Sequence, residues 1–251
     1  NVLARSISAG TEPLPVPPGG FTAAGFIAAT ARLAEDMRWF TALVPAQLAT
    51  LLDDPAAVQL LRSFAGVLVG GQSTPGALLQ RAHDLGVRVV RSYGSSETSG
   101  GCVYDGAPIG QTMVRIEDGE VWLGGPVLAD GYLGDEVRTS ERFVVADGAR
   151  WFRTSDEGTW DGGRLRVTGR RDDVLISGGL KVSAGAIEGV LREHDGLQDA
   201  VVVAAPDARW GQVPVAFTAG GADPAAAIED VVRELGVQAR PARVIRLASL
   251  P

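Results

Sequence analysis

The sequence predicts a mixed α/β protein: a helix-covered parallel sheet, a small antiparallel β subdomain, and a smaller α+β C-terminal domain. Three changes of pattern along the 251 residues support this prediction. Strands and helices alternate over residues 1–105, short strands separated by turns fill residues 106–168, and residues 169–251 mix both types. Because a chain of this length can bury more than one core, we expect the first two segments to form one large domain and the third a separate domain.

The first segment has the alternation that is typical of a helix-covered parallel sheet. Prolines and glycines within residues 12–20 exclude a helix interior there, so regular structure is expected to follow them. Pro45 stands where the first turn of a helix tolerates proline, and Thr74 with Pro75 is expected to cap and start another helix. The predicted helices are 22–36, 46–52 and 75–85, and the predicted strands are 39–44, 67–69 and 87–90.

The second and third segments have shorter repeats of strand and turn. Residues 117–119 form a turn signal between two strand patterns, which favours antiparallel pairing. In the third segment two helix patterns stand among the strands. The predicted strands are 113–116, 120–123, 142–145 and 164–167, then 174–176, 200–204, 213–217 and 243–247, and the predicted helices are 184–192 and 224–235.

Composition and charge point to a globular protein that acts on small molecules. Hydrophobic residues make up 45% and charged residues 21% of the chain, and no apolar run approaches the roughly 18 residues that cross a bilayer. A net charge of −7 disfavours binding to nucleic acid or acidic membranes. The single cysteine, Cys102, excludes an internal disulfide and fits a reducing compartment. We expect a cytoplasmic protein without membrane insertion, with a homodimer as one alternative for its oligomeric state.

The most informative stretch is residues 92–106, which follow the apolar run 87–90. Small hydroxyl and glycine residues there surround one aromatic ring and one carboxylate. Tyr93 can stack on a base, Ser96 can hydrogen-bond to phosphate, and Glu97 can hold Mg²⁺ through oxygen. The stretch is therefore a candidate nucleotide site, and the alternative interpretation is an unusually polar turn.

A glycine-rich loop follows the preceding strand of the predicted sheet. Gly70, Gly71 and Gln72 come directly after the strand at 67–69. Because ligands bind beyond the carboxyl ends of strands in open α/β sheets, two neighbouring strands would offer both loops to one ligand. Taken alone, this loop would be interpreted as a turn.

Two later motifs add charged groups. Residues 151–158 place Asp156 after small hydroxyl residues, where its two oxygens suit a sugar diol, and the alternative is a surface loop in which Asp156 caps a turn. Residues 169–173, which include Arg170, lie where the second and third segments meet. They are a candidate hinge, with a solvated run of charges as the alternative.

The order of these motifs resembles the adenylate-forming acyl-CoA synthetase superfamily over nearly the whole chain. The resemblance rests on Tyr-Gly-Ser-Ser-Glu, then Phe-Arg-Thr-Ser-Asp-Glu-Gly, then Gly-Arg-Arg-Asp-Asp-Val-Leu-Ile-Ser-Gly-Gly. Residues 41–48 and 96–106 are most similar to actinobacterial o-succinylbenzoate-CoA ligases of menaquinone biosynthesis. The resemblance implies the adenylate-forming fold and ATP-dependent ligation of 2-succinylbenzoate to CoA through an acyl-adenylate, with Mg²⁺. The alternatives are another aryl or fatty acyl-CoA ligase, or a nucleotide-binding remnant without catalysis.

The resemblance also implies a role for each candidate residue. The nucleotide would contact Gly70, Gly71, Gln72, Tyr93, Gly94, Asp156 and Arg170. The catalytic groups would be Ser96, Glu97 and Arg170, with Glu97 at the metal. The acyl pocket would include Ser99, Gly100 and Gly101, the hinge Asp172, and the CoA tunnel Gly178 and Gly179. The family's phosphate loop is expected before Asn1 and its catalytic lysine after Pro251, so the fold is expected to be incomplete at both ends.

Overall fold

The computed structural model describes residues 2–13, 20–31, 33, 38–171 and 173–248. Contacts divide the chain into two compact units, one of residues 1–113 with 124–152 and one of residues 114–123 with 153–251. Both contain sheets and helices, so the predicted mixed α/β class is confirmed. The three-segment division predicted from the sequence stays a prediction.

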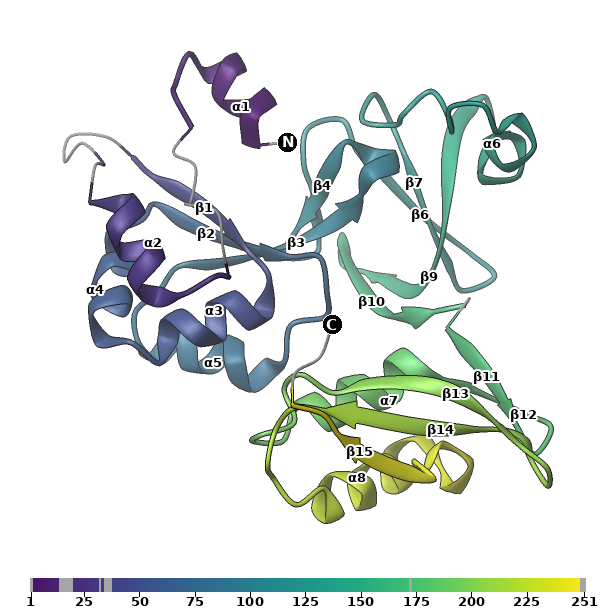
Figure 1. The fold of residues 1–251 in the computed structure, drawn as a ribbon. Coiled ribbons are helices and arrows are strands. Elements are labelled where there is room, and N and C mark those ends of the chain that lie inside the picture. Colours follow the sequence, from purple (N-terminus) through teal and green to yellow (C-terminus); the bar gives the residue numbers. More distant parts are fainter. Residues whose placement is uncertain (1, 14–19, 32, 34–37, 172, 249–251) are drawn as a thin grey trace. The chain divides into compact units, whose positions relative to one another are not determined.

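The first unit contains a five-stranded sheet with helices packed against it (Figure 1). Its elements up to the end of this sheet are α1 (Val2–Ala9), α2 (Ala23–Thr30), β1 (Phe40–Leu43), α3 (Pro45–Leu52), α4 (Pro55–Ser63), β2 (Gly66–Gly70), α5 (Gly76–Asp84), β3 (Val89–Ser95), the 3₁₀ turn η1 (Ser96–Thr98), β4 (Gly100–Tyr104) and β5 (Ala107–Pro108). The strand order is β1-β2-β3-β4-β5. The first three strands pair in parallel, as the alternating pattern predicted, and β4 and β5 add antiparallel pairs.

Helix starts in this unit follow from local sequence. The Asp54 carboxylate accepts hydrogen bonds from the first amides of α4, and Pro55 fills the first helical position. This helix was not predicted, although both signals are in the sequence. Of the predicted helices, 22–36 ends at Thr30, and 75–85 begins at Gly76, with Pro75 and not Thr74 at the N-cap. Fully buried side chains such as those of α3 and α4 each contribute about 1.5–3 kcal/mol to the core.

The interpretation of residues 92–106 as one loop was wrong. β3 continues to Ser95 and turns into the antiparallel strand β4. Gly94 allows the two strands to approach, since a Cβ there would lie 2.2 Å from the carbonyl oxygen of Gly100. The apolar pair Cys102 and Val103 is buried, so β4 contributes to the core as a strand.

Three more elements complete the first unit. They are α6 (Glu136–Arg142), β8 (Phe143–Ala146) and the beginning of β9 (Ala149–Asp161). β8 pairs antiparallel with the first residues of β9, with Phe143 opposite Phe152. Asp135 caps α6 by accepting a hydrogen bond from the Arg138 amide at 2.9 Å, and this helix was not predicted.

The second unit begins with an antiparallel sheet of short strands. Its strands are β6 (Met113–Glu117), β7 (Glu120–Gly124), β9 from Arg153 onwards, and β10 (Arg164–Arg170), in the order β10-β9-β7-β6. The alternative interpretation of residues 151–158, a surface loop in which Asp156 caps a turn, is therefore wrong. The segment is central in its sheet, and Thr154, Ser155 and Asp156 are buried because partners distant in sequence satisfy their polar groups.

The C-terminal part of the second unit is a sheet with two helices. Its elements are β11 (Val174–Ser177), β12 (Leu180–Ser183), α7 (Ala184–Arg192), β13 (Val201–Asp207), β14 (Gly211–Thr218), α8 (Ala225–Leu235), the 3₁₀ turn η2 (Val237–Ala239) and β15 (Arg243–Arg246). The strand order is β12-β11-β14-β13, and β15 pairs parallel with β14. Ile187 of α7 and Val231 of α8 are fully buried in its core. The predicted helices 184–192 and 224–235 are confirmed to within a residue. Among the residues that the structure describes, no helix has the length and apolar character needed to cross a membrane.

Candidate nucleotide site

The two predicted segments of the first unit lie at the carboxyl ends of neighbouring strands. β2 and β3 are parallel, and Gly70 pairs with Ser92. Gly71 and Gln72 follow β2, whereas Tyr93 to Ser95 are the last residues of β3 and Glu97 lies in the 3₁₀ turn after them. The approach is close, because a Cβ on Gly70 would lie 2.7 Å from the Ser92 carbonyl oxygen.

A short hydrogen-bonded turn fixes the backbone around Glu97. Thr98 Oγ1 accepts a hydrogen bond from the Ser95 amide at 2.9 Å and donates to the Gly100 carbonyl at 2.8 Å. The segment after β7 holds the turn from outside, since the Ala129 amide donates to the Glu97 carbonyl at 2.8 Å. Glu97 is thus presented on a rigid turn.

The Glu97 carboxylate has a partner that the sequence analysis did not identify. The Tyr132 hydroxyl donates to Glu97 Oε1 at 2.7 Å, and the Arg138 guanidinium lies 4.3 Å from the centre of the Tyr132 ring. Partial burial alone would raise the pKa of Glu97, but hydrogen bonds from Tyr132 and from its own backbone, with the charge of Arg138, hold the pKa below its ordinary value. Burial and the neighbouring Glu97 carboxylate raise the pKa of Tyr132. The pair is therefore an ionised carboxylate held by a neutral phenol.

The structure brings together the two charged residues that were predicted in the second unit. Asp156 and Arg170 are opposite each other in the β9–β10 register, and Arg170 Nη1 lies 3.2 Å from Asp156 Oδ1. The Asp156 side chain is 13% exposed and that of Arg170 48%. A carboxylate beside a fixed cation can accept hydrogen bonds from a diol, while the cation faces a negative group of the same ligand.

The remaining predicted residues have these positions. Ser99 is left-handed at φ +57°, its hydroxyl donates to the Val127 carbonyl at 3.0 Å, and Gly100 and Gly101 open β4. Gly178 and Gly179 form the two-residue turn between β11 and β12, with φ of +58° and +81° that glycine adopts without strain. Asp172, predicted as the hinge, lies outside the described residues.

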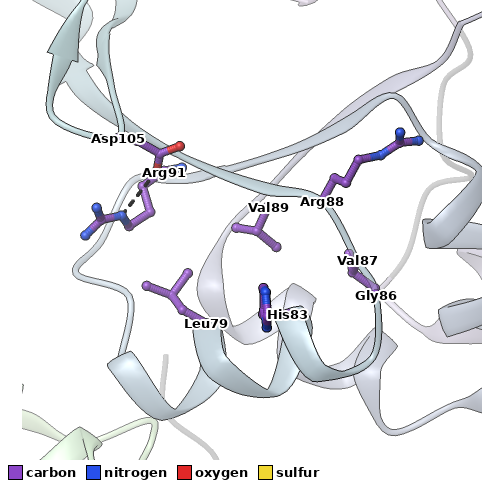
Figure 2. A pocket seen from close by; sticks show the side chains of 8 residues that line it. All are labelled: Leu79, His83, Gly86, Val87, Arg88, Val89, Arg91 and Asp105. Carbon is purple, nitrogen blue, oxygen red and sulfur yellow. Dashed lines mark hydrogen bonds and ion pairs between the residues drawn. The ribbon is translucent and has the colours of Figure 1, made fainter.

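A separate hollow of about 690 Å³ lies in the first unit near the beginning of β3 (Figure 2). An ion pair borders it, between Arg91 Nε and Asp105 Oδ1 at 3.3 Å. Its lining residues are Leu79, His83, Gly86, Val87, Arg88, Val89, Arg91 and Asp105. None of the residues predicted to bind a ligand lines it, so the hollow is distinct from the candidate site.

Comparison with known proteins decides the family. Residues 186–251 match the model of the AMP-binding enzyme C-terminal domain. The whole chain is 38% identical, over 260 aligned positions, to a probable 2-succinylbenzoate–CoA ligase of Mycobacterium tuberculosis, and it covers 66% of that protein. The chain belongs to the adenylate-forming acyl-CoA synthetase superfamily.

Solved structures of adenylate-forming enzymes share the fold. An Escherichia coli MenE variant with bound OSB-AMS has a TM-score of 0.70 at 29% identity, covering 83% of this chain and 46% of that one. The Bacillus subtilis o-succinylbenzoate CoA synthetase with the acyl-adenylate OSB-AMP has a TM-score of 0.72 at 27% identity, covering 92% and 51%. The predicted superfamily and fold are confirmed, and the chain spans about half the length of these structures.

The adenylate-forming family implies Mg²⁺, which binds through oxygen donors. Among the described residues, no group of three or more His, Cys, Asp or Glu side chains could form a protein-only metal site. Mg²⁺ in nucleotide enzymes usually takes one or two carboxylates together with substrate phosphates. The lone, hydrogen-bonded Glu97 carboxylate fits that mode of binding.

Proposed function

We propose that the protein containing this chain ligates 2-succinylbenzoate to CoA, with cleavage of ATP to AMP and pyrophosphate, in menaquinone biosynthesis. The observation that carries the proposal is the 38% identity, along the whole chain, to the probable 2-succinylbenzoate–CoA ligase of M. tuberculosis. The site geometry supports it, since each charged residue predicted for the nucleotide has a fixed partner. We also propose that the reaction takes place in the cytoplasm. That the protein forms a homodimer stays a prediction.

The chemistry requires two successive group transfers, first of the adenylyl group to the substrate carboxylate and then of the acyl group to CoA. A free carboxylate is a poor acceptor for a thiol, because its leaving group would be oxide. In the first step a substrate carboxylate oxygen attacks the α-phosphorus of ATP, and pyrophosphate leaves. In the second step the CoA thiolate attacks the acyl carbon, and AMP leaves with the electron pair of the broken C–O bond. The acyl-adenylate must be protected from water between the two steps.

The roles proposed for the residues follow from their chemistry. Tyr93 stacks on adenine beside the Gly70–Gln72 backbone, and Asp156 accepts hydrogen bonds from the ribose hydroxyls. Arg170 faces the ribose or phosphate edge, and Ser96 donates to the α-phosphate. The others proposed are Gly94 for the nucleotide, Ser99, Gly100 and Gly101 for the acyl pocket, Asp172 for the hinge, and Gly178 and Gly179 for the CoA tunnel.

The proposed metal ligand is Glu97. When bound with the nucleotide, Mg²⁺ would neutralise charge on the phosphates during attack at phosphorus. Tyr132 donates to Oε1 of Glu97, and the 3₁₀ turn Ser96–Thr98 fixes the backbone that carries this carboxylate.

The test is CoA-dependent AMP release by the protein that contains this chain. We expect turnover with 2-succinylbenzoate and much weaker turnover with benzoate, anthranilate and medium-chain fatty acids. Turnover with another acid but not with 2-succinylbenzoate would refute the substrate and favour a different aryl or fatty acyl-CoA ligase. AMP binding without adenylate formation would indicate a nucleotide-binding remnant.

One comparison favours a different acceptor. An amide bond synthetase from Marinactinospora thermotolerans has a TM-score of 0.76 at 28% identity and covers 92% of this chain. The same acyl-adenylate could therefore be given to an amine. Adding CoA or an amine to separate reactions and identifying the product by mass spectrometry distinguishes the two acceptors.

A further inference from the structure

A buried carboxylate with no assigned role lies beside Asp156 in the second unit. Glu120 is the first residue of β7, and its side chain is only 4% exposed. A buried charge is costly unless donors surround it. Glu120 Oε2 accepts hydrogen bonds from Arg153 Nη2 at 3.2 Å and Nε at 3.3 Å, and from the Trp122 indole at 3.2 Å. The second cation nearby is Arg171, whose Nη1 lies 3.8 Å away.

The other carboxylate oxygen holds the backbone next to Asp156. Glu120 Oε1 accepts a hydrogen bond from the Ser155 amide at 3.0 Å. Ser155 is left-handed at φ +63° and is buried. This conformation is unfavourable for a residue with a side chain, so it persists only where surrounding contacts fix it. On the far side, the Ser155 carbonyl accepts from the Arg171 amide at 2.7 Å.

The left-handed residue decides where the next side chain points. Thr154 Oγ1 donates to the Val121 carbonyl of β7 at 2.7 Å and accepts from the Asp156 amide at 2.9 Å. Thr154 is thus bonded to β7, and Asp156 is bonded to Thr154. Asp156 then reaches Arg170 across the β9–β10 ladder. If the backbone at Ser155 relaxed to an extended conformation, the Asp156 carboxylate would change direction.

We propose that Glu120 is a positioning residue for nucleotide binding: it holds Ser155 in the left-handed conformation that aims Asp156 at the ribose diol. The inference rests on the proposed function, because the ribose role of Asp156 is part of it. In this role Glu120 does not contact the ligand itself. Its effect must therefore depend on whether the ligand has the hydroxyls that Asp156 binds.

The experiment compares two ligands on the intact chain by calorimetry, AMP and 2′,3′-dideoxy-AMP. Glu120→Gln should weaken AMP binding about tenfold, because the neutral amide has one acceptor oxygen, for which the Ser155 amide must compete with the donors of Arg153 and Trp122 that now use the second carboxylate oxygen. The same variant should change dideoxy-AMP binding less than about twofold, because that ligand lacks the diol. Equal weakening of both ligands, or no weakening of AMP, would overturn the proposal.

Glu157→Gln is the matched control. The substitution removes the same charge, and Glu157 also lies 3.8 Å from Arg171. Glu157 is on β9 and half exposed, and in the described residues the Ser155 amide donates to Glu120 and not to Glu157. Both ligands should bind this variant as they bind the wild type. If Glu157→Gln gives the same ligand selectivity as Glu120→Gln, then local charge is responsible and the proposal is overturned.

A backbone variant tests the cause directly. Glycine adopts a φ near +63° without strain, so Ser155→Gly in the Glu120→Gln background should recover AMP affinity to within about threefold of wild type. No recovery would contradict the role of the left-handed conformation. If Glu120→Gln does not fold, Glu120→Asp serves instead, because its carboxylate keeps the charge near Arg153 but is too short to reach the Ser155 amide.

Hydrogen exchange separates this inference from the proposed function. If the wild type binds neither ligand, the proposed nucleotide site is wrong. The role of Glu120 in holding Ser155 is then tested by the hydrogen-exchange rates of the Ser155 and Arg171 amides. Both should exchange faster in Glu120→Gln than in the wild type, while the amides of α8 stay unchanged. Unchanged exchange at Ser155 would overturn the inference whatever the ligands do.

Discussion

The hydrogen bond between Tyr132 and Glu97 makes a quantitative prediction for Tyr132→Phe. The variant removes only the hydroxyl and keeps the ring contacts, at 4.3 Å from the Arg138 guanidinium and 5.8 Å between the centres of the Tyr132 and Phe143 rings. A buried hydrogen bond to an ionised group contributes about 1.5–3 kcal/mol. Because the Glu97 carboxyl is partly exposed to solvent, we expect a loss of about 1 kcal/mol. In urea this corresponds to a decrease of about 0.3–1 M in the unfolding midpoint at pH 7.

The pH dependence of this loss follows from the lowered pKa of Glu97. A carboxyl whose pKa is lower in the folded protein contributes stability that is complete above its unfolded pKa, about 4.3, and is lost as the pH falls through the folded pKa. The difference between wild type and Tyr132→Phe should therefore be full at about pH 7 and shrink at about pH 3. Urea unfolding at both pH values, followed by tryptophan fluorescence, measures it.

Tyr104→Phe is the control for removal of a tyrosine hydroxyl. Within the described residues the Tyr104 hydroxyl is buried and makes no hydrogen bond, so its loss should leave the midpoint unchanged or slightly higher. The reasoning is refuted if Tyr104→Phe and Tyr132→Phe destabilise equally. It is also refuted if the effect of Tyr132→Phe is the same at both pH values.

Two further predictions concern the space around two glycines and the accessibility of the single cysteine. Gly94→Ala should lower the free energy of unfolding by about 1–3 kcal/mol, because the new Cβ would lie 2.2 Å from the Gly100 carbonyl oxygen. Gly189→Ala, inside α7, should raise it by about 0.5–1 kcal/mol, because nothing lies within 4 Å of the new Cβ and alanine favours a helix over glycine. Thermal melting of the two variants checks this, and an unchanged melting temperature for Gly94→Ala would contradict it. Cys102 is fully buried and burial raises the pKa of its thiol, so a disulfide reagent at about pH 8 should modify it at least about 100-fold more slowly in the native than in the urea-unfolded protein. Equal rates would show that the thiol is accessible in the native state.

Features with local sequence signals were predictable. The parallel strands β1, β2 and β3 carry apolar runs that alternate with helix patterns, and each pairing follows from that alternation. The segments at the carboxyl ends of β2 and β3 could be placed side by side for the same reason, although Tyr93 to Ser95 belong to β3 and not to a loop. Helix α4 was within reach as well, since Asp54 and Pro55 are a cap and a first-turn proline in sequence.

Features that depend on distant partners were not predictable. β9 carries buried polar residues where a strand pattern would have apolar ones, and Ser155 is satisfied by Glu120, 35 positions earlier. The same separation joins Glu97 to Tyr132, so the candidate metal ligand was identified from its loop while the residue that orients it was not. Buried polar pairing of this kind leaves no periodic signal in either segment.

Photolabelling with 8-azido-AMP tests most directly whether the predicted residues bind the nucleotide. The azide is on the base, so we expect the label to attach to the peptides that contain Gly70–Gln72 and Tyr93, as mapped by mass spectrometry. Asp156→Ala is expected to remove the ribose hold and to abolish that labelling at a ligand concentration near the wild-type Kd. Labelling elsewhere, or labelling at Tyr93 that is unchanged in Asp156→Ala, would contradict the roles proposed for these residues in nucleotide binding.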